Sequence, residues 1–368
     1  MSHEARGSIV VVGATGAVGR EVLAILAERG VKPSCIRAVA SAASAGARIS
    51  YLDQELVCEV LGPTSFDGAR LAIFAASAEI AREYAPLAVR AGALVVDNSS
   101  QFRLDGEVPL IVPEVNGDLL EPGEAQGLVA GLFANPNCST VILSVALEPL
   151  RRAFGIESVH VATYQAVSGA GLPAIDELRS QAAAVLDGRV VPPRFFQEPC
   201  AFNVFSHDSA VDPVTGRNVE EQKIIDELRR IWEMPDLPIT PTCVRVPVVR
   251  AHTQAITVRL SHAASEGELR EVLEAGEGLA VVDDREQNRF PTPLKATGRD
   301  EVLVGRIRHD PGVTRDGAGR SRGVCLLACG DQLRKGAALN AIQIADMCGA
   351  LPQRSNRSTA TATATIVP

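Results

Sequence analysis

The sequence predicts an α/β protein in which an N-terminal, Rossmann-type, doubly wound sheet is followed by an α+β domain. Three observations support this fold class. Short apolar segments alternate with helix-like segments up to residue 97, which is typical of parallel strands joined by helical crossovers. A glycine-rich turn at 13–19 joins the first strand to a helix. Beyond residue 140 the expected strands are longer and mixed with helices, which favours a larger, partly antiparallel sheet.

The elements of the first part follow in a regular order. The expected strands are 8–12, 35–40, 71–75, 94–97, 110–113 and 128–133. The expected helices are 17–29, which is amphipathic and stops at Gly30, and 79–91. This alternation predicts a parallel sheet with helices on both faces.

The second part is predicted to contain longer strands. These are 159–167, 243–249, 255–260 and 324–328, and the helices are 174–186, 219–231 and 266–274. A final apolar helix at 335–349 could return to the first domain. We therefore expect a nucleotide-binding domain at 1–136 completed by 335–352, and a catalytic domain at 137–334. The Ser/Thr/Ala-rich tail, 353–368, has low complexity and is expected to be disordered.

Composition limits the classes of function. The 368 residues carry a net charge of −8, with 46% hydrophobic and 22% charged residues, which describes a globular protein rather than a nucleic-acid binder. No apolar run reaches membrane-spanning length, so no membrane partner is expected. Residues 1–8 lack an apolar export segment, so a cytoplasmic location is expected. The eight cysteines are scattered, which supports neither a disulfide framework nor a metal site.

The turn at 13–19 has the context of a dinucleotide-binding site, because it follows a strand and opens a helix. Its glycines would allow the backbone to approach a pyrophosphate, which the helix N-terminus would stabilise. The residues expected to contact a cofactor here are Gly13, Thr15, Gly16, Ala17 and Val18.

The end of the second strand bears on the type of cofactor. NAD enzymes typically place an acidic residue there to bind the ribose hydroxyl, and this chain has none. The hydroxyls of Ser41 and Ser44 could instead hold a 2′-phosphate, with Arg37 or Arg48 adding positive charge, so NADP is favoured. The alternative is a surface loop whose serines satisfy its own backbone.

Candidate reacting groups lie in two segments. Cys138 precedes an apolar, helix-like run at 141–147, and a helix N-terminus favours the thiolate, although free cysteine is also often a plain core residue. Arg245 and His252 would face opposite sides of a regular strand, but a bend at Pro247 could bring them together. A cysteine, a histidine that accepts a proton and a nicotinamide cofactor suggest aldehyde chemistry through a thioester. An arginine suits a substrate carboxylate because its planar fork binds bidentately.

An ordered set of motifs extends along nearly the whole chain. They are GATGAVG at 13–19, VVDNSSQFR at 95–103, VPEVN at 112–116, NPNCST at 135–140, TYQAVSGAG at 163–171, FNVFSH at 202–207, EEQK at 220–223, RVPVVRAHT at 245–253 and GDQLRKGAALN at 330–340. In these motifs the chain resembles the aspartate-β-semialdehyde dehydrogenase family. The resemblance implies a glyceraldehyde-phosphate-dehydrogenase-like fold, a second domain that also forms a homodimer interface, and further pairing into tetramers as an open alternative.

The resemblance also implies a reaction. This is the reversible, NADPH-dependent reduction of L-4-aspartyl phosphate to L-aspartate 4-semialdehyde and inorganic phosphate, in the biosynthesis of lysine, methionine, threonine and diaminopimelate. Cys138 would form the thioester, His252 would act as general acid and base, and Gln165 would orient the substrate. Arg245 would bind the α-carboxylate and Glu220 the α-amino group.

Further roles follow from the same resemblance. Arg103, Lys223 and Asn137 would bind the phosphate group, for which two cations are well suited. The residues near the nicotinamide would be Ser168, Gly169 and Gln332.

Two features depart from the family pattern. Ala43 stands where many members carry an arginine, which puts their usual contact to the 2′-phosphate in doubt. The segment 208–218 is longer and more polar than expected. Two other readings stay open, a related acyl-phosphate reductase of the N-acetyl-γ-glutamyl-phosphate type and a non-catalytic dinucleotide-binding paralogue. A comparison of substrates separates the first, and the presence of both Cys138 and His252 argues against the second.

Overall fold

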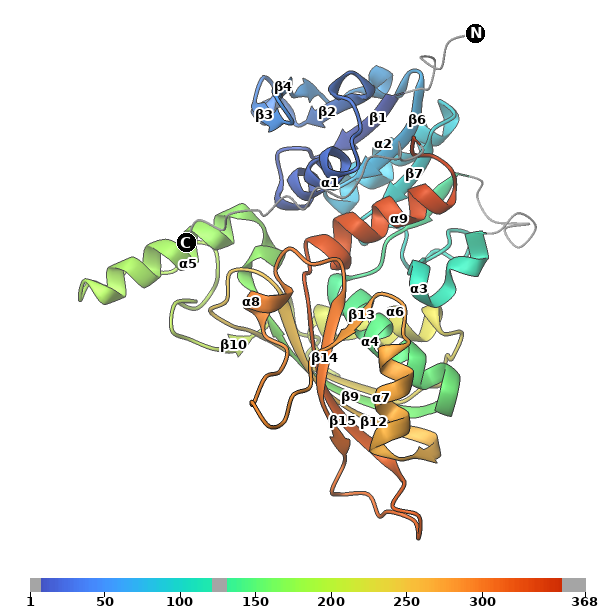
Figure 1. The fold of residues 1–368 in the computed structure, drawn as a ribbon. Helices are drawn as coiled ribbons and strands as arrows, with labels where there is room; N and C mark the ends of the chain where they lie inside the picture. Colours follow the sequence, from blue (N-terminus) through green and yellow to red (C-terminus); the bar gives the residue numbers. More distant parts are fainter. Residues whose placement is uncertain (1–7, 121–130, 353–368) are drawn as a thin grey trace.

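The computed structural model describes residues 8–120 and 131–352. In this part of the chain two large sheets form separate layers, with the N-terminal sheet at the top of Figure 1. The tail at 353–368 and the start of the predicted strand at 128–133 lie outside the described residues. No helix in the described ranges is long and apolar enough to cross a membrane.

The first sheet is parallel and has the strand order β5-β2-β1-β6-β7-β8. Its strands are β1 (Ser8–Val12), β2 (Ile36–Ala40), β5 (Glu59–Val60), β6 (Ala69–Phe74), β7 (Leu94–Asp97) and β8 (Leu132–Ala134). The order reverses between β1 and β6, and ligands of such sheets bind beyond the carboxyl ends of the strands at this point. The predicted fold class of the N-terminal part is confirmed.

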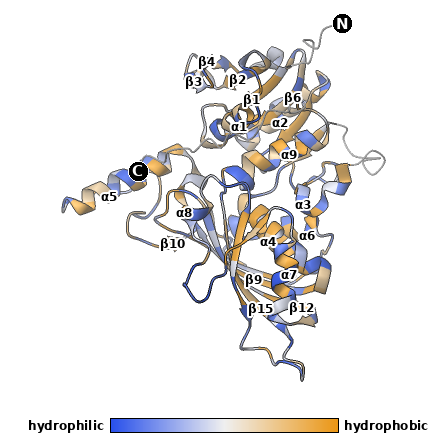
Figure 2. Ribbon diagram, viewed as in Figure 1, coloured by the Kyte–Doolittle hydropathy of each residue, from blue (hydrophilic) through white to orange (hydrophobic). Residues whose placement is uncertain are grey.

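Helices cover both faces of this sheet. Ile9 and Val11 of β1 pack with α1 (Ala17–Glu28) and α9 (Leu339–Met347), whereas Val10 and Val12 pack in the cluster that contains α2 (Ala78–Arg90). Alternate strand residues point to opposite faces, so a strand between two helical layers must be apolar throughout. Figure 2 shows this apolar character along β1 and β6.

One local prediction for the first part was wrong, and one pair of strands was not predicted. The segment 110–113 is no strand, because Leu110 makes only an isolated bridge to Ala134 and Pro113 begins the short helix α3 (Pro113–Asn116). Proline suits a first helical position since its fixed φ is already helical. The prediction also missed the hairpin of β3 (Arg48–Tyr51) and β4 (Gln54–Val57), one side of which is buried through Ile49, Tyr51 and Leu56.

The second sheet is mixed, with the order β10-β11-β9-β12-β15-β14-β13. Its strands are β9 (Ile156–Gln165), β10 (Phe205–Ser206), β11 (Ile239–Arg245), β12 (His252–Ala264), β13 (Leu279–Val281), β14 (Val302–His309) and β15 (Ser321–Gly330). β9 and β11 are parallel, while β12 is antiparallel to both β9 and β15. The predicted strand at 243–249 is wrong in its second half, because β11 ends at Arg245.

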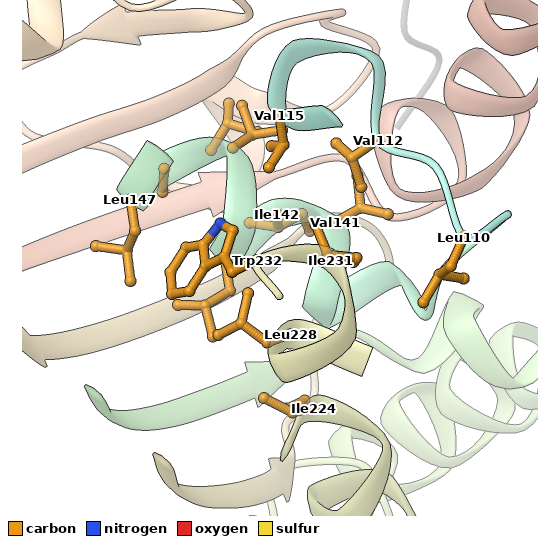
Figure 3. Packing of buried hydrophobic residues seen from close by; sticks show 14 of the residues in the cluster. Leu110, Val112, Val115, Val141, Ile142, Leu147, Ile224, Leu228, Ile231 and Trp232 are labelled. Carbon is orange, nitrogen blue, oxygen red and sulfur yellow. The ribbon is translucent and has the colours of Figure 1, made fainter. Parts of the chain in front are cut away.

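One face of this sheet is covered by α4 (Cys138–Phe154), α6 (Val219–Ile231) and α7 (Glu266–Glu274). Figure 3 shows Val141 and Ile142 of α4 in one apolar cluster with Leu228 and Trp232 of the α6 region. Residues of the first sheet belong to the same cluster, so the core is continuous through α4. The other helices of the second part are α5 (Leu172–Leu186) and the short α8 (Pro293–Ala296).

The C-terminal segment returns to the first sheet. A π-helical turn over Arg334–Ala338 continues directly into α9, whose apolar residues pack beside α1. The predicted helix at 335–349 is therefore present, with an irregular first turn. Such π turns widen the helix locally and are frequent at functional sites.

Candidate active site

The turn between β1 and α1 is shaped for close approach to a ligand. Gly13 has φ 80°, and a Cβ added there would meet the carbonyl oxygen of Ala75 at 2.3 Å. A Cβ on Gly19 would meet the carbonyl oxygen of Gly13 at 2.2 Å. Gly16 caps α1 and leaves the first N–H groups of the helix available. These features fit a bound pyrophosphate, as the sequence predicts.

The loop after β2 is exposed and carries Ser41 at the start of a 3₁₀ turn that ends at Ser44. The structure does not bring Arg37 to this loop, because its guanidinium donates to Ser8 Oγ and to the carbonyl oxygen of Asp67. Arg48 is paired with Glu55 on the neighbouring hairpin. The charge proposed from Arg37 is therefore not supplied at this loop, and a 2′-phosphate contact by the two serines stays a prediction.

A cavity of about 330 Å³ lies where the two parts of the chain meet. Its walls contain most of the residues that the sequence analysis selected. They are Val18, Arg103, Asn137, Cys138, Gln165, Gly169, Glu220, Lys223, Arg245, His252 and Gln332. Ser41 and Ser44 do not line this cavity.

Cys138 is the first residue of α4, and Asn137 caps the helix by accepting hydrogen bonds from two backbone N–H groups. The Sγ of Cys138 lies 3.5 Å from Nε2 of His252. Burial raises the pKa of Cys138 to about 12, and the Glu220 carboxylate adds to the rise. A helix N-terminus favours the thiolate, as the sequence predicts, but in this site desolvation outweighs the positive groups around the sulfur, so the protonated thiol is the favoured form.

His252 is fully buried at the start of β12. The backbone N–H of Ala166 donates to its Nδ1 over 3.0 Å, so the proton of the neutral ring belongs on Nε2, the atom that faces Sγ. Burial lowers the pKa of His252 to about 3, and the charge of Arg245 adds to that effect. The ring is therefore neutral near pH 7 and offers an N–H donor beside the sulfur.

Three neighbouring strand ends hold the site together. Gln165 ends β9, Arg245 ends β11 on one side of it and His252 begins β12 on the other. The segment between Arg245 and His252 crosses the end of β9, where Val167 and Ser168 donate to backbone carbonyls of the crossing segment. This crossing brings Arg245 and His252 to one cavity, as the expected bend at Pro247 required.

Glu220 is buried near the N-terminus of α6. Its Oε1 accepts hydrogen bonds from Asn137 Nδ2 at 2.8 Å and from Gln165 Nε2 at 3.1 Å. Its Oε2 lies 3.3 Å from Lys223 Nζ. Although burial opposes ionisation, the charge of Lys223 leads the interactions that lower the pKa of Glu220 to about 2.

Arg103 enters the cavity from the first part of the chain. Its guanidinium donates to the carbonyl oxygens of Asn135 and Asn98 and pairs with Glu227 at 3.1 Å. Arg103 and Lys223 both line the cavity beside Cys138, which suits an anionic leaving group.

The residues expected near the nicotinamide form one connected group. The Gln332 side chain donates to Ser168 Oγ and accepts from the Ala251 N–H. Gly169 lies against the imidazole, since a Cβ added there would be 3.4 Å from two atoms of the His252 ring. These contacts connect the group to His252, which faces Cys138.

Three cavity or supporting residues were missed by the sequence analysis. His207 and Asp208 follow β10 and contact Arg245, and Glu227 holds both Arg103 and the backbone N–H of Asn137. The unusual segment 208–218 was a signal for Asp208. Nothing in the sequence distinguishes Glu227 from other charged residues of an exposed-looking helix, because its role depends on contacts 90 or more residues away.

The arrangement has a defined chemical capacity. A thiol beside an imidazole can form a thioester, cations can hold a departing oxyanion, and a glycine turn can hold a dinucleotide. The residues implied by the resemblance for the reaction, the substrate and the phosphate are thus brought together in one cavity.

Comparisons with known proteins agree with this geometry. The semialdehyde dehydrogenase NAD-binding domain matches residues 8–122, and the semialdehyde dehydrogenase dimerisation domain matches 147–335. The second match indicates a homo-oligomer.

Similar proteins span nearly the full chain. The aspartate-semialdehyde dehydrogenase of Corynebacterium glutamicum is 42% identical, covering 92% of this chain and 98% of its own, and that of Synechocystis sp. is 39% identical, covering 92% and 96%. The solved aspartate semialdehyde dehydrogenase II of Vibrio cholerae, complexed with ASA, superposes with a TM-score of 0.84 at 35% identity, covering 93% of this chain and 98% of its own. The chain therefore belongs to the aspartate-semialdehyde dehydrogenase family.

Proposed function

We propose that this protein catalyses the reversible reduction of L-4-aspartyl phosphate to L-aspartate 4-semialdehyde and inorganic phosphate, with NADPH as the reductant. The observation that carries the proposal is the Cys138 Sγ, 3.5 Å from His252 Nε2, in a cavity that also contains Arg103, Lys223 and Arg245. Family membership supports the same reaction.

The acyl-transfer step uses groups of this chain. The Cys138 sulfur attacks the acyl carbon, a new S–C bond forms, and the C–O bond to phosphate breaks. Arg103 and Lys223 hold the departing phosphate, and the Asn137 amide lies beside them. Because burial raises the pKa of the thiol, we propose that it gives up its proton only as the acyl phosphate is attacked, and that the departing phosphate takes this proton as the C–O bond breaks.

NADPH held at the glycine turn would supply the hydride that reduces the thioester carbon. The resulting tetrahedral oxyanion lies beside His252, whose neutral ring presents Nε2–H, and preorganised donors of this kind stabilise such charge strongly. Collapse breaks the S–C bond and releases the aldehyde. We propose that Gln165 orients this centre and that Arg245 and Glu220 hold the amino-acid end of the substrate.

The cofactor site is proposed to use Gly13, Thr15, Gly16, Ala17 and Val18 for the pyrophosphate. Its other contacts are proposed to be Ser41, Ser44, Ser168, Gly169 and Gln332. The glycine turn and the absence of an acidic residue at the end of β2 support NADP.

We further propose that residues 1–136 with 335–352 form the NADP-binding domain and that 137–334 form the catalytic and dimerisation domain. A homodimer is the expected assembly, with a tetramer as the next larger one. A role in amino-acid biosynthesis from a phosphorylated intermediate is consistent with a cytoplasmic enzyme.

The proposal is tested by phosphate-dependent reduction of NADP with L-aspartate 4-semialdehyde, with NAD measured in parallel. A rate that requires phosphate and favours NADP is the expected result. A comparable NAD rate would keep the reaction and assign the lost discrimination to Ala43. No rate with either cofactor, from protein that still binds nucleotide, would contradict the proposed reaction.

A further inference from the structure

Asp208 occupies an unexpected place in the cavity, directly on the arginine proposed to bind the substrate carboxylate. Its Oδ1 accepts from Arg245 Nε at 3.0 Å and from Arg245 Nη2 at 2.6 Å. Although burial opposes ionisation, the charge of Arg245 leads the interactions that together lower the pKa of Asp208, so this carboxyl is ionised at neutral pH. The buried Arg245 and the partly exposed Asp208 thus form a pair with no net charge.

The remaining donors of Arg245 are nearly all used. Nη1 donates to the carbonyl oxygen of Ala166 at 3.0 Å, and Nη2 is 2.9 Å from Nε2 of His207. A guanidinium has five N–H groups, and the protein engages four of them. Within residues 8–120 and 131–352 one Nη1 hydrogen has no acceptor and is available for a substrate carboxylate, so the bidentate contact expected from the sequence does not fit this arrangement.

Glu220, proposed to bind the substrate amino group, is also heavily engaged. Its two oxygens receive the amides of Asn137 and Gln165 and the ammonium of Lys223. An incoming ammonium group would have to share a carboxylate whose charge is already balanced by a lysine three residues away.

Asp208 differs from Glu220 in having a free oxygen. Among residues 8–120 and 131–352, no other residue donates a hydrogen bond to its Oδ2. The side chain is 25% exposed and lines the same cavity as Cys138. Its second oxygen is thus an unused anionic acceptor beside the arginine that is proposed to bind the α-carboxylate.

We propose that Asp208 binds the α-ammonium group of the substrate, so that Arg245 and Asp208 together recognise a free α-amino acid head group. This inference rests on the proposed function. The carboxylate and ammonium of an α-amino acid share one carbon, and an adjacent guanidinium and carboxylate match those two charges. Asp208 is therefore a specificity-determining residue, which disfavours deaminated and N-acylated substrates because they leave its second carboxylate oxygen without a charged donor.

The fold keeps Asp208 in place. β10 pairs with the end of β11, with Phe205 opposite Arg245, and the His207 N–H donates to the carbonyl oxygen of Cys243 at 3.0 Å. The following residue, Ser209, accepts a hydrogen bond from the Glu220 N–H at 3.2 Å. The Asp208 carboxylate and the start of α6 are therefore held together before substrate binds. This reduces the entropic cost of ordering the site on binding.

The test compares Asp208→Asn with the natural protein on two substrates. L-Aspartate 4-semialdehyde has both head-group charges, and succinic semialdehyde has the carboxylate alone. We expect kcat/KM for the amino-acid substrate to fall about 10- to 100-fold, mainly through KM, since an ionic hydrogen bond is lost. The value for succinic semialdehyde should change less than about threefold. If succinic semialdehyde is not turned over, its inhibition constant is compared instead.

The control is Asp212→Asn, on the same segment but exposed and engaged only within its own turn. It should leave both substrates unaffected. Thermal unfolding of both variants shows that they are folded.

Three results would overturn the inference. Equal losses on both substrates would mean that Asp208 only positions Arg245. A higher kcat/KM on both substrates would mean that Asp208 competes with the substrate carboxylate for Arg245. An unchanged kcat/KM on both would mean that Glu220, and not Asp208, binds the ammonium group. Failure of the proposed function is a separate outcome, because the natural protein would then not act on L-aspartate 4-semialdehyde at all.

Discussion

At the scale of single residues, the balance between burial and charge decides the state of the reacting pair. Cys138 has three cationic side chains near it and a helix N-terminus beneath it, yet its pKa rises to about 12. The His252 ring is neutral for the related reason that burial disfavours its cation. Such a pair is a hydrogen-bonded thiol and imidazole at neutral pH rather than an ion pair.

This state predicts how the thiol reacts with iodoacetamide in the absence of substrate. A raised pKa means that the thiolate fraction increases about tenfold for each pH unit up to about 12. The inactivation rate should therefore rise between pH 7 and 9.5 with no plateau. Measurement by residual activity reports Cys138 alone among the eight cysteines.

A matched control is alkylation of the Cys138→Ser variant, followed by mass spectrometry, which gives the background from the other thiols. A plateau near pH 7 in the natural protein would show a lowered pKa and would contradict the burial argument.

At the scale of elements, two turns position the site. One is the turn that opens α1, and the other is the π turn that leads into α9. The first depends on glycines because backbone atoms lie where a Cβ would be. The second carries Lys335, which is fully buried and donates to Glu114 at 2.6 Å and to Asn340 at 2.8 Å. Both turns hold together segments that are distant in the sequence. We expect a change in the first turn to affect NADPH binding and a change in the second to affect the free energy of unfolding.

Gly19→Ala should weaken NADPH binding about tenfold or more, because the added Cβ displaces the backbone that approaches the pyrophosphate. Its Cβ would lie 2.2 Å from the carbonyl oxygen of Gly13. The dissociation constant can be measured by NADPH fluorescence.

The matched control is Gly62→Ala, where no atom lies within 4 Å of the added Cβ. It should leave the dissociation constant unchanged. Equal affinity in the natural protein and Gly19→Ala would argue against a pyrophosphate at this turn.

Lys335→Met should lower the free energy of unfolding by about 3 to 5 kcal/mol, because Glu114 is left buried without its countercharge. Although burial opposes it, Lys335 lowers the pKa of Glu114, so this carboxylate is charged at neutral pH. Urea unfolding followed by circular dichroism provides the measurement.

The double variant Lys335→Met with Glu114→Gln should recover part of that loss, since the unpaired charge is removed. A double variant as unstable as the sum of both single variants would show that the charge pair is not the cause.

At the scale of the whole molecule, the two faces of the second sheet differ. Helices α4, α6 and α7 cover one face (Figure 1), whereas Ala162 lies on the other, between Thr242 and Ala255 in register. These small side chains are half-buried or exposed in the single chain. Because this sheet lies within the match to a dimerisation domain, we infer that the open face contacts a second copy.

Ala162→Glu should therefore lower the solution mass toward that of one chain, 38.8 kDa, since burying an unpaired carboxylate at an interface is unfavourable. Sedimentation velocity measures this mass. Ala153→Glu, on the exposed side of α4, is the matched control and should keep the natural mass. An unchanged mass in Ala162→Glu would place the interface elsewhere.

Much of the protein was predictable because local rules control it. The parallel strands of the first sheet, the helices at 219–231 and 266–274, and the turn at 13–19 follow from apolar periodicity and glycine spacing. These rules failed for two segments that have strand propensity. The segment 110–113 is no strand because Pro113 begins a helix, and 246–249 is no strand because it crosses the end of β9.

By itself, the sequence determined the family, the fold class and the set of candidate residues, because motifs and periodicity are properties of neighbouring positions. The tertiary structure alone decided how those residues act on each other. Sγ of Cys138 and the ring of His252 meet across 114 residues, and Asp208 reaches Arg245 across 37. Protonation depends on burial and on charges brought together in space, and no spacing along the chain contains either quantity.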